Sequence, residues 1–174
     1  RLDTLYTKYD FLIHFVDDYM VKNKKLDLTS KDGWGCDAPN YLDEFYREFQ
    51  LTLKAPTFKN IGYWFRPRVI FELTLIKSAI KETENKDIRE FFSVAMSEII
   101  RLVSNRRNGE FKMFRMTPEK VATFNPDTKQ EFIKVLERNI DKMCDFTDAY
   151  DYLATASQVS IYCEDACKLP SVPC

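Results

Sequence analysis

Glycine and proline are scarce in this chain, with 4 and 7 residues respectively among 174. This scarcity argues against a fold made of many tight turns and favours long helices. The sequence contains no run of about 18 apolar residues, so it predicts no membrane-spanning helix. It does not open with a basic and then apolar signal segment. We therefore expect a cytoplasmic protein.

Histidine is almost absent, and the cysteines follow no recognised spacing. His14 is the single histidine, so a catalytic Ser-His-Asp or Cys-His arrangement would have to use it. Its place in a helical pattern favours a partly buried structural role. The odd number of cysteines and the lack of a C-x-x-C pair predict free thiols and no metal site. The five are Cys36, Cys144, Cys163, Cys167 and Cys174.

Charge is balanced over the whole chain but not within it. The totals are 26 Lys and Arg against 27 Asp and Glu, whereas the stretch 101–117 holds five cations and the single acid Glu110. A local excess of this kind attracts polyanions and positions them through phosphate contacts. The alternative is a solvated loop whose cations balance the negative C-terminal end of the preceding helix. The cations are Arg101, Arg106, Arg107, Lys112 and Arg115, with Ser104, Asn105 and Asn108 among them.

Apolar residues recur at helical spacing along most of the chain. They predict helices over about 3–23, 41–49, 67–80, 87–103 and 126–154, with a shorter helix opened by Thr117-Pro118. Asp3 and Asn125 are the expected caps of the first and last of these. Residues 158–163 instead alternate at period two, which predicts a strand. The expected fold class is mainly α, a helical bundle-like region with a short terminal β-strand.

The segment G-Y-W-F-R-P-R, residues 62–68, has two possible roles. Aromatic rings beside arginines bind nucleic acid by stacking and phosphate contact. The favoured alternative is structural, with Trp64 and Phe65 starting the core and Pro67 at the first turn of a helix. The chain contains neither G-x-G-x-x-G nor a P-loop, so no glycine motif for binding phosphate is expected.

Two long segments resemble the helical region of bacterial DNA methyltransferases that modify the exocyclic amine of adenine or cytosine. They are Y-W-F-R-P-R-V-I-F-E-L-T-L-I-K and F-F-S-V-A-M-S-E-I-I-R-L-V-S-N-R-R-N-G-E-F-K-M-F-R-M. The tail V-S-I-Y-C-E-D-A-C-K-L-P resembles the strand and G-D-A-x-x-L-P segment of that family. Glu164 stands where glycine is usual, and Cys167 where a basic residue is common. The resemblance covers roughly residues 40–174.

This resemblance implies a function and a division of the chain. Residues 1–156 would be a helical insertion that contacts DNA through Ser104, Asn105, Arg106, Arg107, Asn108, Lys112 and Arg115. Residues 157–174 would begin the methyltransferase sheet, with Asp165 near the adenine of S-adenosylmethionine. The family's glycine-rich cofactor motif and its Pro-Pro-Tyr catalytic motif are not in this sequence. We therefore expect an internal piece of a restriction-modification methyltransferase, with DNA and the remaining methyltransferase domain as its partners.

A second reading of the sequence involves no enzyme. The chain could be a helical protein–protein interaction module whose basic loop binds an acidic partner.

Overall fold

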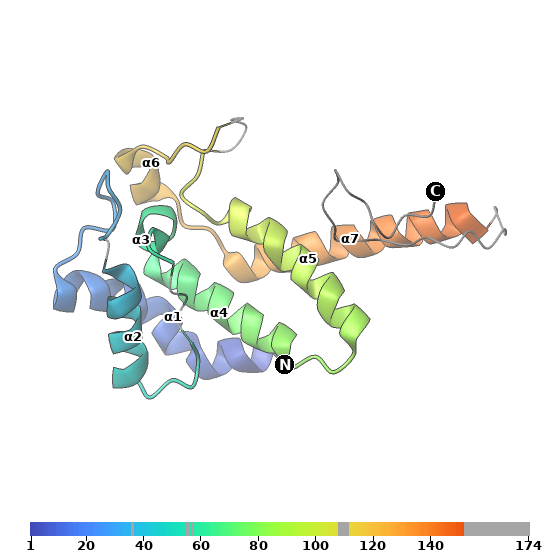
Figure 1. Cartoon of the computed structure of the whole chain (residues 1–174), viewed down its shortest axis with the longest axis horizontal. Helices are drawn as coiled ribbons and strands as arrows, with labels where there is room; N and C mark the ends of the chain where they lie inside the picture. Colours follow the sequence, from blue (N-terminus) through green and yellow to red (C-terminus); the bar gives the residue numbers. More distant parts are fainter. Residues whose placement is uncertain (36, 55, 57, 108–111, 152–174) are drawn as a thin grey trace, which may run out of the picture. The chain divides into compact units, whose positions relative to one another are not determined.

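The computed structural model describes residues 1–151 except 36, 55, 57 and 108–111. In this part of the chain the regular structure is helical (Figure 1). The helices are α1 (Leu2–Lys24), α2 (Ala38–Glu48), α3 (Ile61–Trp64), α4 (Pro67–Lys81), α5 (Lys86–Leu102), α6 (Pro118–Thr123) and α7 (Thr128–Asp151). The predicted mainly-α class is therefore confirmed, whereas the predicted strand over 158–163 lies outside the described residues. No described helix is long and apolar enough to cross a membrane.

The chain forms two compact units, Arg1–Ile140 and Asp141–Cys174. The first contains α1 to α6 and the start of α7. In the second, the structure describes the C-terminal part of α7 as far as Asp151. The surfaces described below all belong to the first unit.

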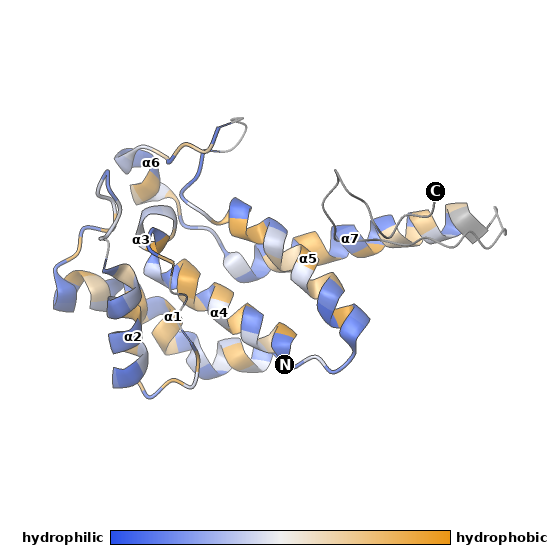
Figure 2. Ribbon diagram, in the orientation of Figure 1, coloured by the Kyte–Doolittle hydropathy of each residue, from blue (hydrophilic) through white to orange (hydrophobic). Residues whose placement is uncertain are grey.

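Helix α4 is the centre of the first unit. Every residue from Val69 to Ile76 is buried, and so is Ile80. Helix α1 packs along α4, and α5 contacts it across the short connection 82–85 (Figure 1). This burial fits the sequence, because the stretch from Val69 to Ile76 is apolar except for Glu72 and Thr74, and orange segments recur along α4 between paler and blue ones (Figure 2).

An aromatic cluster joins α1, α2 and α4. The ring of Phe45 lies 5.0 Å from that of Tyr19 and 6.1 Å from that of Phe71, in both cases nearly edge-to-face. Tyr46 meets Phe71 in the same way at 5.8 Å. Such pairs stabilise a core beyond the area that they bury. The aromatic-rich composition thus serves to pack short α2 against two long helices.

Several helix ends differ from the predictions. Helix α1 begins at Leu2 after Arg1, so Asp3 lies in its first turn and not at its cap. Helix α7 begins at Thr128, two residues after Pro126, because the Asp127 carboxylate accepts a hydrogen bond from the Gln130 backbone N–H at 2.9 Å. That bond satisfies an N–H group that has no partner within the helix.

Several residues whose spacing predicted buried or partly buried positions are exposed. Ile88 in α5 is 46% exposed and Ile140 in α7 is 49% exposed. His14 is also exposed and faces Asp10 one turn earlier, with 3.6 Å between Nε2 and Oδ1. Helical periodicity identifies residues that share a face, but it does not tell whether another element covers that face.

Short α3 was not predicted and is held by the turn that contains Trp34. The indole Nε1–H of this buried side chain donates to the Phe65 carbonyl at 2.6 Å. The Trp34 backbone N–H donates to the Gly62 carbonyl at 3.2 Å. Gly33 has φ +79°, and a Cβ there would lie 2.5 Å from the Gly62 oxygen and from the Tyr63 Cα. The turn and α3 therefore meet backbone to backbone.

A buried carboxylate lies where α1, α4 and α7 converge. Glu72 is 2% exposed, and Arg68 Nη2 approaches its Oε1 at 3.5 Å. Burial raises the pKa of the Glu72 carboxyl, although Thr128 and Arg68 act in the opposite direction. Burial also raises the pKa of Asp17, which accepts a hydrogen bond from the Arg68 backbone N–H. The ionised form of each carboxyl is therefore disfavoured by folding.

The contact between Gly33 and α3 leads to the first prediction. Gly33→Ala should lower the free energy of unfolding by about 2 kcal/mol or more, because the new methyl group meets backbone atoms that cannot rotate away. Gly35→Ala is the matched control. Gly35 also has a positive φ, +119°, but its nearest atom to a new Cβ lies 3.9 Å away. Urea denaturation measures both variants, and equal losses would show that the close approach is unimportant.

The buried carboxylate leads to the second prediction. A carboxyl whose pKa is higher in the folded than in the unfolded state binds more protons when folded, so stability falls as pH rises from the unfolded through the folded pKa. Glu72→Gln removes this loss. The variant's free energy of unfolding should therefore rise relative to that of the wild type as the pH increases above about 4, the pKa of a glutamate in the unfolded chain. Because Asp17 is present in both proteins, its effect cancels. A difference that stays constant with pH would contradict the assignment to Glu72.

Candidate nucleic-acid interface

The basic loop, residues 104–116, leaves the end of α5 and folds back on itself. The Arg107 backbone N–H donates to the Phe114 carbonyl at 2.8 Å, and that of Met116 donates to the Asn105 carbonyl at 2.7 Å. Arg106 and Arg115 form an antiparallel bridge between the two arms. The loop therefore has two paired arms at its base. Residues 108–111, including Asn108, lie outside the described residues.

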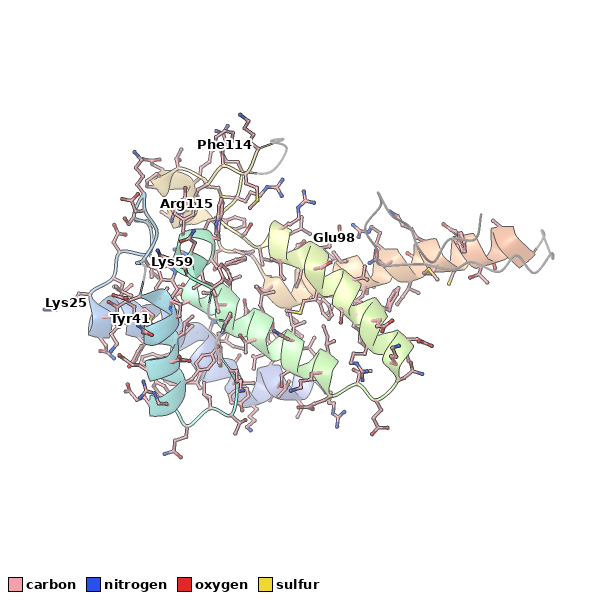
Figure 3. The ribbon with its side chains drawn as sticks, viewed as in Figure 1. Lys25, Tyr41, Lys59, Glu98, Phe114 and Arg115 are labelled. Carbon is pink, nitrogen blue, oxygen red and sulfur yellow. The ribbon has the colours of Figure 1, made fainter. Side chains whose placement is uncertain are left out.

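The base of the loop is attached to α3 and to the turn before Trp34. The Asn105 backbone N–H donates to the Trp64 carbonyl at 2.7 Å. The Arg115 guanidinium donates from Nε to the Tyr63 carbonyl and from Nη1 to the Ser30 carbonyl, both at 2.7 Å. It also lies 5.2 Å from the centre of the Tyr63 ring. Three segments far apart in the sequence thus meet around one arginine (Figure 3).

The residues predicted to contact DNA divide into two groups. Ser104, Asn105 and Arg106 are buried, at 5%, 1% and 9% exposure. The Ser104 hydroxyl donates to the Arg101 carbonyl at 3.0 Å. Arg115 is half-buried, and burial lowers the pKa of its guanidinium. These four side chains lie within or against the base of the loop.

The second group faces solvent. The side chains of Arg107 and Lys112 are exposed, as is that of Arg101 at the end of α5. Met113 and Phe114, between the cations of the returning arm, are 65% and 48% exposed. Exposed cations on a braced hairpin can reach a phosphate backbone without displacing core side chains.

A small cavity opens beside α3, next to the base of the basic loop. Its volume is about 260 Å³, and Asp32, Gly35, Lys59, Asn60, Tyr63 and Trp64 line it. Of these residues, Tyr63 and Trp64 belong to the aromatic segment 62–68 whose pattern suggested a possible nucleic-acid contact. Lys59 and Asn60 come just before α3, where the pattern predicts an irregular connection, so no periodicity marks them. The structural alternative for residues 62–68 is confirmed for Phe65 and Pro67, which are both buried.

A larger, apolar groove of about 640 Å³ runs between α4, α5 and the segment before α3. Phe65, Ile70, Leu73 and Met96 form much of its lining, and Lys54 and Lys77 are part of it. The ionisable side chains among its described lining residues are the two lysines. Its shape and lining suit an apolar segment of another protein.

We next consider the residues that could bind a metal ion or a cofactor in the described part of the chain. It contains no group of three or more His, Cys, Asp or Glu residues placed to hold a metal ion. Asp165, together with Cys163, Cys167 and Cys174, lies outside the described residues. Gly33 and Gly62 do not form a cradle for a cofactor, because protein atoms already occupy the space where each Cβ would be.

Comparison with known proteins gives one informative similarity. Over 84 residues the chain is 48% identical to the type II methyltransferase M.MvaI of Kocuria varians. The matched segment is 48% of this chain and 18% of that relative, so the chain corresponds to a minor part of the relative's length. No family model matches the chain, and no solved structure matches it. The chain is thus similar, over about half its length, to part of a type II methyltransferase.

Proposed function

We propose that this chain is the helical, DNA-contacting region of an S-adenosylmethionine-dependent DNA methyltransferase of a restriction-modification system. The observation that carries the proposal is the 48% identity over 84 residues to a type II methyltransferase. The resemblance to enzymes that methylate the amine of adenine or cytosine supports the same class. DNA and the remaining methyltransferase domain are the proposed partners, in the cytoplasm.

In this proposal, the cofactor is bound mainly by other parts of the enzyme. S-adenosylmethionine supplies the methyl group when bound, and Asp165 is the residue of this chain proposed to lie near its adenine. Gly33 and Gly62 are engaged in internal packing and do not fit a cofactor cradle. We expect the 174-residue chain alone neither to hold the cofactor tightly nor to methylate DNA.

The proposed DNA contact follows the division of the basic loop. Arg107 and Lys112 are exposed and contact phosphates. The buried Arg106 and the half-buried Arg115 hold the two arms in place, Arg115 through bonds to carbonyls. Ser104 and Asn105 fix the base of the loop, and Asn108 lies near the DNA. Contacts to phosphate position a protein on DNA without reading its sequence.

Salt dependence provides the test. Each phosphate contact adds about −0.9 to the slope of log affinity against log salt concentration. Arg107→Ala with Lys112→Ala should therefore flatten the slope by about two units and weaken binding to unrelated duplexes to a similar extent. Arg106 is left intact because its burial would confuse a loss of binding with a loss of folding.

The control replaces two exposed lysines at the other end of the α4–α5 pair. Lys81→Ala with Lys86→Ala removes the same charge far along α5 and should leave the slope unchanged. If the loop variant keeps the wild-type slope while its circular dichroism is unchanged, the loop is a solvated helix end and the proposed DNA contact is wrong. If both variants flatten the slope equally, the effect is one of net charge alone.

The apolar groove favours a second candidate, the non-enzymatic helical protein–protein interaction module. Phe58 at the groove is 48% exposed and Ile100 is 37% exposed. With Lys54 and Lys77 beside them, the groove would suit an apolar segment that carries acidic residues. The same salt titration separates the two functions, since a module without a DNA role would bind duplex DNA at most weakly, and equally in the loop and control variants.

A further inference from the structure

We propose that the cavity beside α3 binds a single unpaired nucleobase of the DNA. This inference rests on the proposed function and adds a site to it. The cavity is walled by Tyr63 and Trp64 and carries Asp32, Lys59 and Asn60 at its polar side. Its volume of about 260 Å³ is below the range of about 300–1,000 Å³ usual for drug-sized ligands. It suits one planar base better than a whole cofactor.

The aromatic walls form a corner. The rings of Tyr63 and Trp64 lie 4.8 Å apart with an angle of 88° between their planes. Both side chains are half-buried, so each ring keeps an accessible part. A base that stacks on one ring presents its edge to the other ring. Stacking of bases on aromatic side chains is the common way to bind unpaired nucleotides because every base has a flat face.

The corner is rigid without a ligand. The Trp64 carbonyl accepts the Asn105 N–H, and the Tyr63 carbonyl accepts the Arg115 guanidinium. The same guanidinium lies against the Tyr63 ring. These contacts fix the backbone that carries both rings, so binding a base would require little reordering. A site of this kind loses little entropy when it is filled.

The polar residues match the edge and the phosphate of a nucleotide. Asn60 precedes α3 but makes no capping hydrogen bond with its side chain. Its amide offers both donors and an acceptor, which is the combination that reads base edges. The exposed side chains of Asp32 and Lys59 add a carboxylate acceptor and a cation. Together they can recognise the edge of a base and its phosphate.

The position of the cavity favours DNA over a free nucleoside as the source of the base. Arg115 contacts Tyr63 in the cavity wall and belongs to the basic loop proposed to contact phosphates. A strand held by Arg107 and Lys112 would therefore pass close to the cavity. Free adenosine would gain nothing from those cations, since it carries no phosphate.

The test uses the full 174-residue chain and two labelled duplexes of equal charge. One has an additional, unpaired adenine in one strand. The other is fully paired and carries one terminal phosphate, which matches the charge of the extra nucleotide. The wild type should bind the bulged duplex about tenfold more tightly, the effect of stacking one base on an aromatic side chain. Asn60→Ala and Trp64→Leu should each remove most of this preference and leave affinity for the paired duplex nearly unchanged. Asn23→Ala, at an exposed position in the last turn of α1, should keep the preference.

The outcomes separate this inference from the proposed function. Equal affinity of the wild type for both duplexes would overturn the base site while leaving DNA binding intact. A preference that persists in both cavity variants would also overturn it. If free adenosine binds the wild type but not the two cavity variants, and the wild type does not prefer the bulged duplex, the cavity binds a nucleoside and the proposed site for a DNA base is wrong. If neither duplex is bound, the proposed function itself fails. Asn60→Ala keeps the test decisive should Trp64→Leu unfold, because Asn60 is exposed.

Discussion

The contact between the turn at Trp34 and α3 supports every surface discussed above. A buried indole N–H bonded to the Phe65 carbonyl and a glycine with no room for a side chain bring two backbones together. Helix α3 has only four residues, Ile61–Trp64, and has too few internal hydrogen bonds to stand by itself. Its carbonyls at Tyr63 and Trp64 then receive the basic loop. If the turn moved, the base of the loop and the cavity would both lose their support.

The basic loop shows why charge in a sequence is not the same as charge on a surface. Its four cations cannot be distinguished by residue type in the sequence, yet they differ in burial and in the groups that they contact. Arg106 is buried, and Arg115 bridges two backbone carbonyls, which requires the planar guanidinium with its several donors. Arg107 and Lys112 project into solvent. An arginine that bonds to carbonyls 52 and 85 residues away is a structural tie whatever the electrostatic pattern suggests.

The long helices could be predicted from the sequence because their apolar stripes are local and strong. Helix α4 follows Pro67 as expected, and α5 ends near Val103. Helix α3 could not be predicted, since one turn has no periodicity and depends on Trp34, which lies about thirty residues earlier. The cations of the candidate interface could be named in advance, but their burial could not, because it depends on backbone carbonyls of distant segments. Lys59 and Asn60 had no local pattern that would have indicated the cavity.

The burial of α4 has a consequence for how the chain may be shortened. Helix α1 covers α4 along its length, and the Asp17 carboxylate caps the α4 backbone at Arg68. A version that lacks the first 24 residues would therefore expose a continuous apolar helix face to water and would remove the acceptor of the Arg68 backbone N–H. Such a truncated product would self-associate even though it keeps the arms of the basic loop and all the lining residues of the cavity. The N-terminal helix therefore protects from water the apolar surface of a helix that begins some forty residues later in the chain.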